Sequence, residues 1–416
     1  MKTTKLSLRI FTLILLFIFP YGFAGSPLIP NSLMLNHDAF PAEIMQHDIT
    51  QSPFKELNQA LGKVNIGAKN SKFNGTILIG YQGKVIFQNA YGNADRANGL
   101  KHSMDTPTQI ASITKTFTGT AMAWLQEKNI LKLSDPVQKH LWEFPYANIT
   151  LEQLLSHRSG LPDYINYSNR YWSSSEPMYN DEVLKQFATY KFSLKFTPGA
   201  KFDYSNSNYA ILALVIEKAS GMSYKDFMAK YIFEPLHMNN TFVFDPAETP
   251  KFVIAKSYRA NFTDWKNTHQ DGVYGDKGIF TTAEDLFKWD QALYSDKFIS
   301  EQTRQDVFEP RLAWNQTRNY GLGWRIKTYE SGNKYAYHTG WWHGYQGILS
   351  RYMKDEFTVV ILSNRFISGI SANSELIYST AAQYLPLTDL NEKTEEPPVD
   401  DPELEWMEGI EIAASF

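Results

Sequence analysis

The pair Ser112 and Lys115 constrains this chain more than any other feature. The two residues are three apart at the start of an apolar helical stripe, so they share one helix face. The stripe follows the 3.6-residue period at Ile113, Phe117, Ala121, Trp124 and Leu125. A nearby amine activates a serine hydroxyl without a histidine partner, and a helix start offers N–H groups to an oxyanion. Ser112 is therefore a candidate nucleophile, with an ordinary N-capping serine as the alternative.

The same Ser-x-x-Lys spacing occurs at two other positions in the chain. Ser52 is followed by Pro53 in a polar stretch, and Ser331 begins a Ser-Gly-Asn turn. Only Ser112 opens a helical pattern, so it is preferred as the nucleophile.

The first 24 residues have the composition of a secretory signal peptide. Three basic residues precede an apolar run, residues 10–19, which is short for a membrane span, and Gly22-Phe23-Ala24 fits a cleavage site. We expect export to a bacterial periplasm or the medium, with a retained N-terminal anchor as the alternative. The chain has no cysteine, which excludes disulfides and lipidation at a signal-peptide cysteine. No second apolar run is long enough to cross a membrane after cleavage.

Composition divides the rest of the chain into a leader, residues 25–55, one large domain, residues 56–386, and an acidic tail, residues 387–416. Hydrophobic residues make up 43% of the chain, enough for a sizeable core. The stretch 386–416 has ten carboxylates against one lysine, which is typical of a solvated or loosely docked extension. The other basic residues are scattered, so we expect no nucleic-acid partner; the sequence leaves the oligomeric state open.

Strand-like runs lie near both ends of the domain, and the middle is helical. Residues 74–89 predict a hairpin around Gln82-Gly83, and three later runs predict strands at 335–338, 345–352 and 357–362. Between them, the pattern predicts helices at 209–219, closed by Gly221, and after a cap at Thr282; residues 370–385 predict a final helix. We therefore expect an α+β fold. Its N- and C-terminal strands form one antiparallel sheet with helices on its faces, and a large, mostly helical insertion separates them.

Two further motifs follow Ser112 and Lys115 in a fixed order, Tyr204-Ser205-Asn206 and then His338-Thr339-Gly340. This order resembles the serine β-lactamase and penicillin-binding-protein superfamily, with its S-x-x-K, S-D-N and K-T-G motifs. The Tyr-x-Asn form is similar to the class C branch, which contains class C β-lactamases, D-alanyl-D-alanine carboxypeptidases, D-amino-acid-specific peptidases and esterases. The resemblance extends from about Leu57 to Leu385 and includes the segments 154–162, 196–199 and 278–285. Tyr204 is preferred over other Tyr-x-Asn matches because it follows the Pro198-Gly199 turn and precedes a helix.

The resemblance implies a role for each motif residue. Tyr204, next to Lys115, would exchange protons with Ser112 and then with the leaving group. Asn206 would hold the substrate and Lys115, and the strand of His338, Thr339 and Gly340 would line the site, where Gly340 lets a substrate backbone approach closely. The backbone N–H groups of Ser112 and Trp341 would form the oxyanion hole.

Two departures from the β-lactamase pattern affect the expected substrate. His338 stands where β-lactamases have a lysine, and a histidine is a cation only when it is protonated. Trp341 and Trp342 follow Gly340, where carboxylate-binding relatives have smaller residues; one of the two is expected to pack on the strand face. Both changes argue against strong β-lactam hydrolysis.

We therefore expect an exported serine hydrolase acting on small-molecule or peptide substrates through an acyl-enzyme. D-alanyl-D-alanine carboxypeptidase or D-peptidase activity is preferred, an esterase or weak β-lactamase is the alternative, and a non-turnover penicillin- or peptide-binding sensor is an alternative of another class. The histidines lack a zinc-ligand spacing, so we expect no metal, and the chemistry requires no cofactor. His157 and Arg158 are interpreted as loop scaffolding.

Overall fold

The computed structural model describes residues 29, 37–64, 73–313, 318–367 and 369–388. The predicted signal peptide, residues 1–24, lies outside the described residues, as does the acidic tail beyond Thr388. Within the part described, Met45 and His47 of the predicted leader form backbone hydrogen bonds with Val85.

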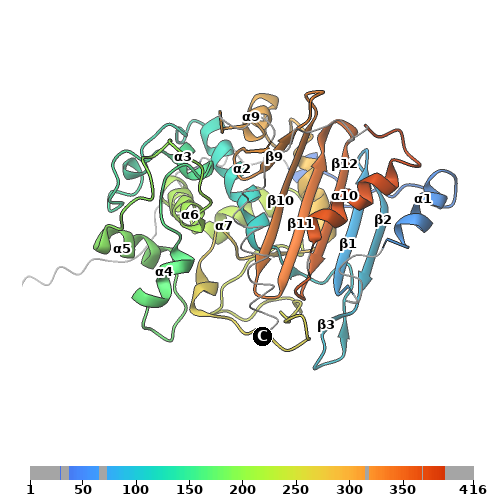
Figure 1. Cartoon of the computed structure of the whole chain (residues 1–416), viewed down its shortest axis with the longest axis horizontal. Coiled ribbons are helices and arrows are strands. Elements are labelled where there is room, and N and C mark those ends of the chain that lie inside the picture. Colours follow the sequence, from blue (N-terminus) through green and yellow to red (C-terminus); the bar gives the residue numbers. More distant parts are fainter. Residues whose placement is uncertain (1–28, 30–36, 65–72, 314–317, 368, 389–416) are drawn as a thin grey trace, which may run out of the picture.

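A seven-stranded antiparallel sheet is the centre of the domain (Figure 1). Its strand order is β2-β1-β12-β11-β10-β9-β8. β1 pairs with β2 on one side and with β12 on the other, so strands from the two ends of the domain lie side by side. This confirms the α+β fold predicted from the sequence. The strand bounds are β1 Gly75–Tyr81, β2 Lys84–Tyr91, β8 Arg318–Tyr320, β9 Arg325–Thr328, β10 Lys334–Trp342, β11 Tyr345–Tyr352 and β12 Phe357–Ser363.

Helices cover both faces of the sheet, which explains why its central strands are apolar throughout. Every residue of β1, β11 and β12 is buried. On one face, α1 (Phe54–Leu61) and α10 (Ile370–Ala381) pack with a cluster that includes Ile77 and Ile361. On the other face, α8 (Ala283–Ala292) contacts β1 and β12 and joins the larger core.

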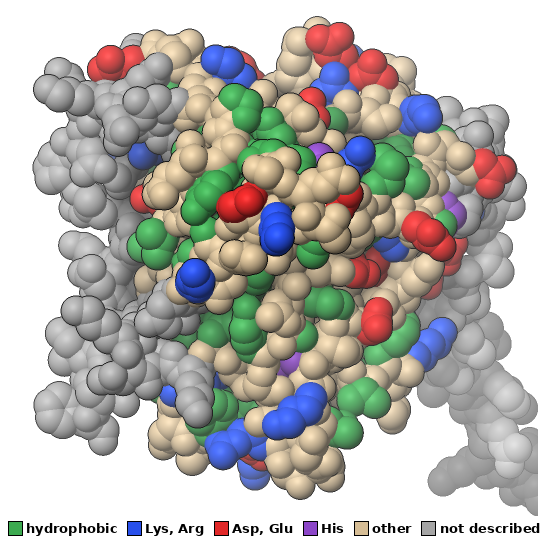
Figure 2. Space-filling view, turned by 90° about the vertical axis from the view of Figure 1, so that its right-hand side faces the viewer, with side chains coloured by type: hydrophobic (Ala, Val, Ile, Leu, Met, Phe, Trp, Pro, Cys, Tyr) green, Lys and Arg blue, Asp and Glu red, His purple; other side chains and the backbone are tan. Residues whose placement is uncertain are grey.

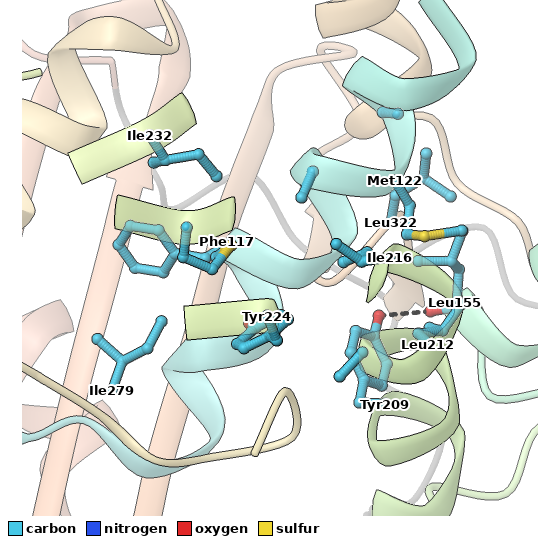
Figure 3. Close-up of a cluster of buried hydrophobic side chains, with 14 of the residues drawn as sticks. Phe117, Met122, Leu155, Tyr209, Leu212, Ile216, Tyr224, Ile232, Ile279 and Leu322 are labelled. Carbon is cyan, nitrogen blue, oxygen red and sulfur yellow. Dashed lines mark hydrogen bonds between the residues drawn. The ribbon is translucent and has the colours of Figure 1, made fainter. Parts of the chain in front are cut away.

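The larger core joins this second face to the helical region between β2 and β8. α2 (Thr114–Glu127) is buried along almost its whole length and packs against α6 (Asn206–Ser220) and α9 (Glu301–Val307). Figure 3 shows part of this core, where Tyr209 Oη donates to the Leu155 carbonyl. Gly221 ends α6 in the left-handed conformation, as its position in the sequence predicts. The other helices are α3 Leu151–Leu155, α4 Tyr164–Tyr171, α5 Asn180–Tyr190 and α7 Tyr224–Met228.

Short strands complete the connections around the core. β3 (Asn93–Asp95) pairs with β4 (Leu100–Lys101), and β7 (Ile279–Thr281) lies between β5 (Thr108–Gln109) and β6 (Phe242–Val243). At the α1 end of the molecule, Figure 2 shows hydrophobic side chains scattered among charged side chains of both signs. Among the described residues, no helix combines the length and apolar character that a bilayer crossing needs.

Candidate active site

Ser112 lies in a tight turn that leads directly into α2. The turn, η3 (Ala111–Ile113), is a short 3-10 helix, and the side chain of Ser112 is almost completely buried. Ala111 has a φ of 45°, a left-handed conformation that is unfavourable for a residue with a Cβ. Such strain is retained where the surrounding structure holds the backbone firmly, so the orientation of Ser112 is well defined.

Lys115 occupies the centre of the site, one helical turn after Ser112. Its Nζ donates to Ser112 Oγ at 2.9 Å, to Asn206 Oδ1 at 2.8 Å and to the Asp276 carbonyl at 2.9 Å. The side chain is fully buried. An ammonium has three N–H donors and no acceptor, so three surrounding oxygens match the protonated form of Lys115.

The other two oxygens come from distant parts of the chain. Asn206 is the first residue of α6, and Asp276 belongs to the loop before β7. Thr118 of α2 donates to the carbonyl of Gly275 in the same loop at 2.7 Å, which anchors the loop beside Lys115. Asn206, predicted to hold Lys115, thus lies against it, while the contact from Asp276 has no signal in the sequence.

Tyr204 lies beside Lys115, with Lys115 Nζ 4.9 Å from its ring centre. The buried ring of His157 stacks on Tyr204 at a centroid distance of 4.2 Å. Nδ1 of His157 accepts from the backbone N–H of Ser205 at 3.1 Å, so this histidine supports both Tyr204 and the residue after it. Burial, with the charge of Lys115, holds the pKa of His157 well below its usual range, so its ring is neutral.

His338 of β10 is fully buried and hydrogen-bonded at both ring nitrogens. Nδ1 donates to the Thr339 carbonyl at 2.6 Å, so Nε2 is the acceptor for Tyr320 Oη at 2.9 Å. Burial, followed by the charges of Arg325 and Lys115, holds the pKa of His338 well below its usual range. His338 is therefore neutral at physiological pH and cannot supply a positive charge to a substrate.

Gly340 brings β10 against the turn that carries Ser112. A Cβ at this position would lie 2.1 Å from the Ile110 carbonyl oxygen. The close approach at Gly340 is therefore made by the chain's own backbone, whereas we expected a substrate backbone there. Thr339 and Trp341 are half-buried on either side of Gly340 in the strand.

The two tryptophans after Gly340 have different surroundings. Trp341 packs edge-on against Phe366 and donates through Nε1 to the His343 carbonyl at 2.8 Å. Trp342 donates through Nε1 to Asp271 at 2.8 Å, and Lys277 Nζ lies 4.8 Å from its ring centre. Both rings are fixed by contacts with neighbouring loops.

Arg325 of β9 is a second cation at the site that the sequence analysis missed. It is paired with Tyr337 in the sheet, and its guanidinium carbon lies 5.4 Å from the ring centre of Tyr204. β8 and β9 have only three and four residues and carry charged side chains, so neither was recognised as a strand. The alternation of Arg325, Ile326, Lys327 and Thr328 is the signal that could have identified β9. In the part of the chain that the structure describes, no three His, Asp or Glu side chains converge as a metal-ligand set.

Comparison with known proteins identifies the family and the fold. The profile of the beta-lactamase family matches residues 66–381. Penicillin-binding protein 4* of Bacillus subtilis is 33% identical over 315 residues, which cover 72% of this chain and 70% of that protein. The teichoic acid D-alanine hydrolase of Staphylococcus aureus is 25% identical over 354 residues, 81% of this chain and 83% of that protein. The crystal structure of the D-amino acid amidase from Ochrobactrum anthropi SV3, complexed with L-phenylalanine amide, superposes with a TM-score of 0.66 at 22% identity. The superposition covers 79% of this chain and 99% of the amidase chain.

The chain belongs to the beta-lactamase family, in the superfamily that also contains penicillin-binding proteins. It is a serine hydrolase of that fold, as the order of its motifs predicts.

Proposed function

We propose that the protein is an exported serine hydrolase that cleaves amide or ester bonds of D-amino-acid-containing substrates through an acyl-enzyme. D-alanyl-D-alanine carboxypeptidase activity is its expected main reaction. The observation that carries this proposal is the 2.9 Å contact between Lys115 Nζ and Ser112 Oγ, made while Asn206 and Asp276 hold the same ammonium. A fixed, buried cation beside a serine hydroxyl stabilises the alkoxide that forms during attack.

Acyl transfer then follows from the groups around Ser112. Ser112 Oγ attacks the substrate carbonyl carbon while its proton passes to Tyr204, whose phenolate form the Lys115 ammonium favours. The N–H groups of Ser112 and Trp341 donate to the oxyanion, with about 3 kcal/mol of transition-state stabilisation from each donor. Tyr204 returns the proton to the leaving group as the carbon–nitrogen or carbon–oxygen bond breaks. Water attacks the acyl-enzyme by the reverse steps and releases the acid and Ser112.

Arg325 supports a substrate that carries a carboxylate. An arginine is charged at every physiological pH, whereas His338 is neutral. The guanidinium lies on the Tyr204 side of the site, where the leaving group receives its proton. A leaving D-alanine has a free carboxylate that a guanidinium binds well, which favours a carboxypeptidase over a simple esterase.

The relatives support the choice of D-amino acids. Two of them are named for such substrates, a teichoic acid D-alanine hydrolase and a D-amino acid amidase. Hydrolysis of esters by the same site is the second candidate, since the acyl-enzyme chemistry is shared. Weak β-lactam hydrolysis is a side activity expected of the fold.

A non-turnover sensor is the alternative from another class. Such a protein would be acylated at Ser112 and would release product too slowly for repeated turnover. The neighbouring positions of Lys115, Asn206 and Tyr204 support an enzyme, because a sensor does not need efficient deacylation.

The test begins with a fluorophosphonate probe and mass spectrometry of the intact protein. We expect one adduct, mapped to Ser112 and absent in Ser112→Ala. A panel of D-Ala-D-Ala peptides, neutral esters and a chromogenic β-lactam then ranks the substrates by kcat/KM. Faster hydrolysis of the β-lactam than of peptides and esters would contradict the proposal, and a burst without turnover would identify a sensor.

Arg325→Gln tests the carboxylate contact separately. We expect KM for a D-Ala-D-Ala peptide to rise roughly tenfold or more, the scale of a lost charged hydrogen bond, while a neutral ester is hydrolysed within about threefold of wild type. If the substitution changes the hydrolysis of the peptide and of the neutral ester equally, Arg325 does not bind the substrate carboxylate.

Export is proposed on the composition of residues 1–24. The expected result is a mature chain that begins at Gly25 in the periplasm or medium, read by N-terminal sequencing of protein from fractionated bacteria. An N-terminus at Met1 in the cytoplasmic fraction would contradict it.

A further inference from the structure

Asp163 lies directly behind Asn206, on the side away from Lys115. It is the N-cap of α4, where its Oδ1 accepts from the backbone N–H of Ile165 at 3.0 Å. Its Oδ2 accepts from both the backbone N–H and the side-chain Nδ2 of Asn206, at 2.9 and 2.8 Å. The carboxylate is almost completely buried, so these contacts do not compete with bulk water.

The two neighbours of Asn206 determine which way its amide points. Burial raises the pKa of Asp163, but both of its oxygens accept from N–H groups, which is the pattern of an ionised carboxylate. Such a carboxylate only accepts hydrogen bonds, so Nδ2 of Asn206 must face Asp163. The Lys115 ammonium only donates, so Oδ1 must face Lys115, where the distance is 2.8 Å. With Asp163 absent, the same amide could rotate and present its NH₂ group to the cation.

We propose that Asp163 is a positioning residue for acyl transfer, which fixes the Asn206 amide so that its oxygen holds Lys115 against Ser112. The inference rests on the proposed function and extends it by one residue. Asp163, Asn206, Lys115 and Ser112 form a continuous hydrogen-bonded series from a buried carboxylate to the nucleophile. A carboxylate that orients the next polar group is the arrangement that keeps the histidine of a Ser-His-Asp triad in place.

Asp163→Asn separates positioning from helix capping. The asparagine has one acceptor oxygen where the aspartate has two. With that oxygen kept on the Ile165 N–H, the NH₂ group faces the donors of Asn206; with the oxygen turned to Asn206, the cap is lost, so the midpoint of thermal unfolding distinguishes the two arrangements. We expect the rate of Ser112 labelling and kcat/KM to fall by roughly 100-fold, the scale of a small misplacement of a catalytic group. The midpoint of thermal unfolding should stay within about 4 °C of wild type, since the cap is retained.

A double-mutant cycle with Asn206→Ala tests whether Asp163 acts through Asn206. If it does, Asp163→Asn has no more than about a threefold further effect in the Asn206→Ala background. If the fold-losses of the two single substitutions multiply in the double mutant, the two residues act independently and the inference is overturned. Asp285→Asn is the matched control, because Asp285 is a buried carboxylate in the first turn of α8 that accepts from Asn240 and Thr241. Asp285→Asn should leave the rate of Ser112 labelling within about threefold of the wild-type rate.

The side-chain NH₂ signal of Asn206 provides a measurement that does not need turnover. In ¹H–¹⁵N spectra this signal is identified by its loss in Asn206→Ser. We expect it to exchange slowly in the wild type and at least tenfold faster, with a changed shift, in Asp163→Asn. An unchanged signal would overturn the inference whatever the activity.

The two proposals can fail separately. If the Asn206 amide signal changes in Asp163→Asn while the wild-type protein never acylates Ser112, the positioning by Asp163 is supported and the proposed function is refuted. If Asp163→Asn does not fold, Asp163→Ser takes its place, because serine keeps the cap and is too short to reach Asn206.

Discussion

Lys115 shows how one buried side chain can be held in a single charge state and orientation. Its three N–H groups each meet an oxygen, from the η3 turn, α6 and the loop before β7. Removing a charge from water is costly, and three short hydrogen bonds offset that cost. The resulting cation lies between the candidate nucleophile and Tyr204, so both residues experience its charge.

Substituting Lys115 or Tyr204, the two groups proposed to assist proton transfer from Ser112, should reduce turnover strongly. Lys115→Ala and Tyr204→Phe are each expected to lower kcat by roughly 100-fold or more, the usual scale of lost general acid–base catalysis. Steady-state kinetics on a D-Ala-D-Ala peptide measures the loss, and circular dichroism checks the fold.

Tyr146→Phe is the matched control for the tyrosine substitution. Tyr146 also makes a hydrogen bond through its hydroxyl, to the Phe192 carbonyl at 2.5 Å, and its ring packs against Phe144 and Phe187. It should keep kcat within about twofold. Near-normal activity of folded Tyr204→Phe would mean that another group accepts the serine proton.

The two buried histidines should make stability depend on pH. The pKa values of His157 and His338 are held well below the unfolded value of about 6.5. As pH falls below about 6.5, the unfolded chain binds protons that the folded protein does not, so the free energy of unfolding decreases. Each histidine contributes up to about 1.4 kcal/mol per pH unit.

His338→Gln isolates the contribution of one histidine. Between pH 6.5 and 5.5, the free energy of unfolding of this variant should fall by about 1 kcal/mol less than that of wild type, as measured by urea denaturation. Above pH 7.5 the two proteins should have parallel profiles. Equal slopes below pH 6.5 would show that His338 becomes protonated in the folded state.

At the scale of elements, the site depends on the contact between β10 and the η3 turn. Gly340 faces the Ile110 carbonyl, and the register of β10 with β11 pairs Gly340 with Gly347. Two glycines side by side leave room for the turn that carries Ser112. The proposed oxyanion hole, made by the backbone N–H groups of Ser112 and Trp341, requires this close approach.

Gly340→Ala should therefore disturb both stability and chemistry. Its Cβ would overlap the Ile110 carbonyl at 2.1 Å, so β10 or the η3 turn must move. We expect a loss of about 2 kcal/mol in urea unfolding and a labelling rate at Ser112 at least tenfold lower. Gly62→Ala is the control, because its Cβ would meet nothing closer than 3.4 Å, and it should change stability by less than about 0.5 kcal/mol. Normal labelling of Gly340→Ala would show that the contact is not needed.

At the scale of the whole molecule, the end of the described chain lies far from the site along the sheet. Thr388 Oγ1 donates to Asp355 at 2.8 Å, in the connection between β11 and β12. The β10–β11 turn, near Gly340 and Trp341, is at the opposite end of these strands. The acidic stretch that follows Thr388 in the sequence thus starts at the end of the sheet away from Ser112.

Removing the residues after Thr388 should leave catalysis intact. The truncated chain keeps the Thr388–Asp355 contact, and we expect kcat/KM on a neutral ester to stay within about threefold of the full chain. The same assay at low and high salt separates an effect of the lost negative charge from one of structure. A tenfold loss, or a sharp gain, would show that the tail supports or blocks the site.

The sequence by itself determined the fold class, the hydrolase family and the placement of Lys115 one turn after Ser112. Local periodicity identified α2, because its apolar residues repeat every 3.6 positions, while apolar runs bounded by turn residues identified α6 and the β1–β2 hairpin. The order of the three motifs indicated the family, since each motif lies on an element whose position the fold fixes.

Only the tertiary structure decided how the site is completed. Arg325 lies on a strand of only four residues, whose alternation is too short to stand out, Asp163 lies in a loop before α4, and Asp276 contributes a backbone carbonyl, which has no sequence signal. The charge of His338 was also undetermined, because a pKa depends on burial and on neighbouring cations, and these are set by chain segments far apart in the sequence. The contact of Gly340 with Ile110 was undetermined for the same reason, since Ile110 lies 230 residues earlier in the chain.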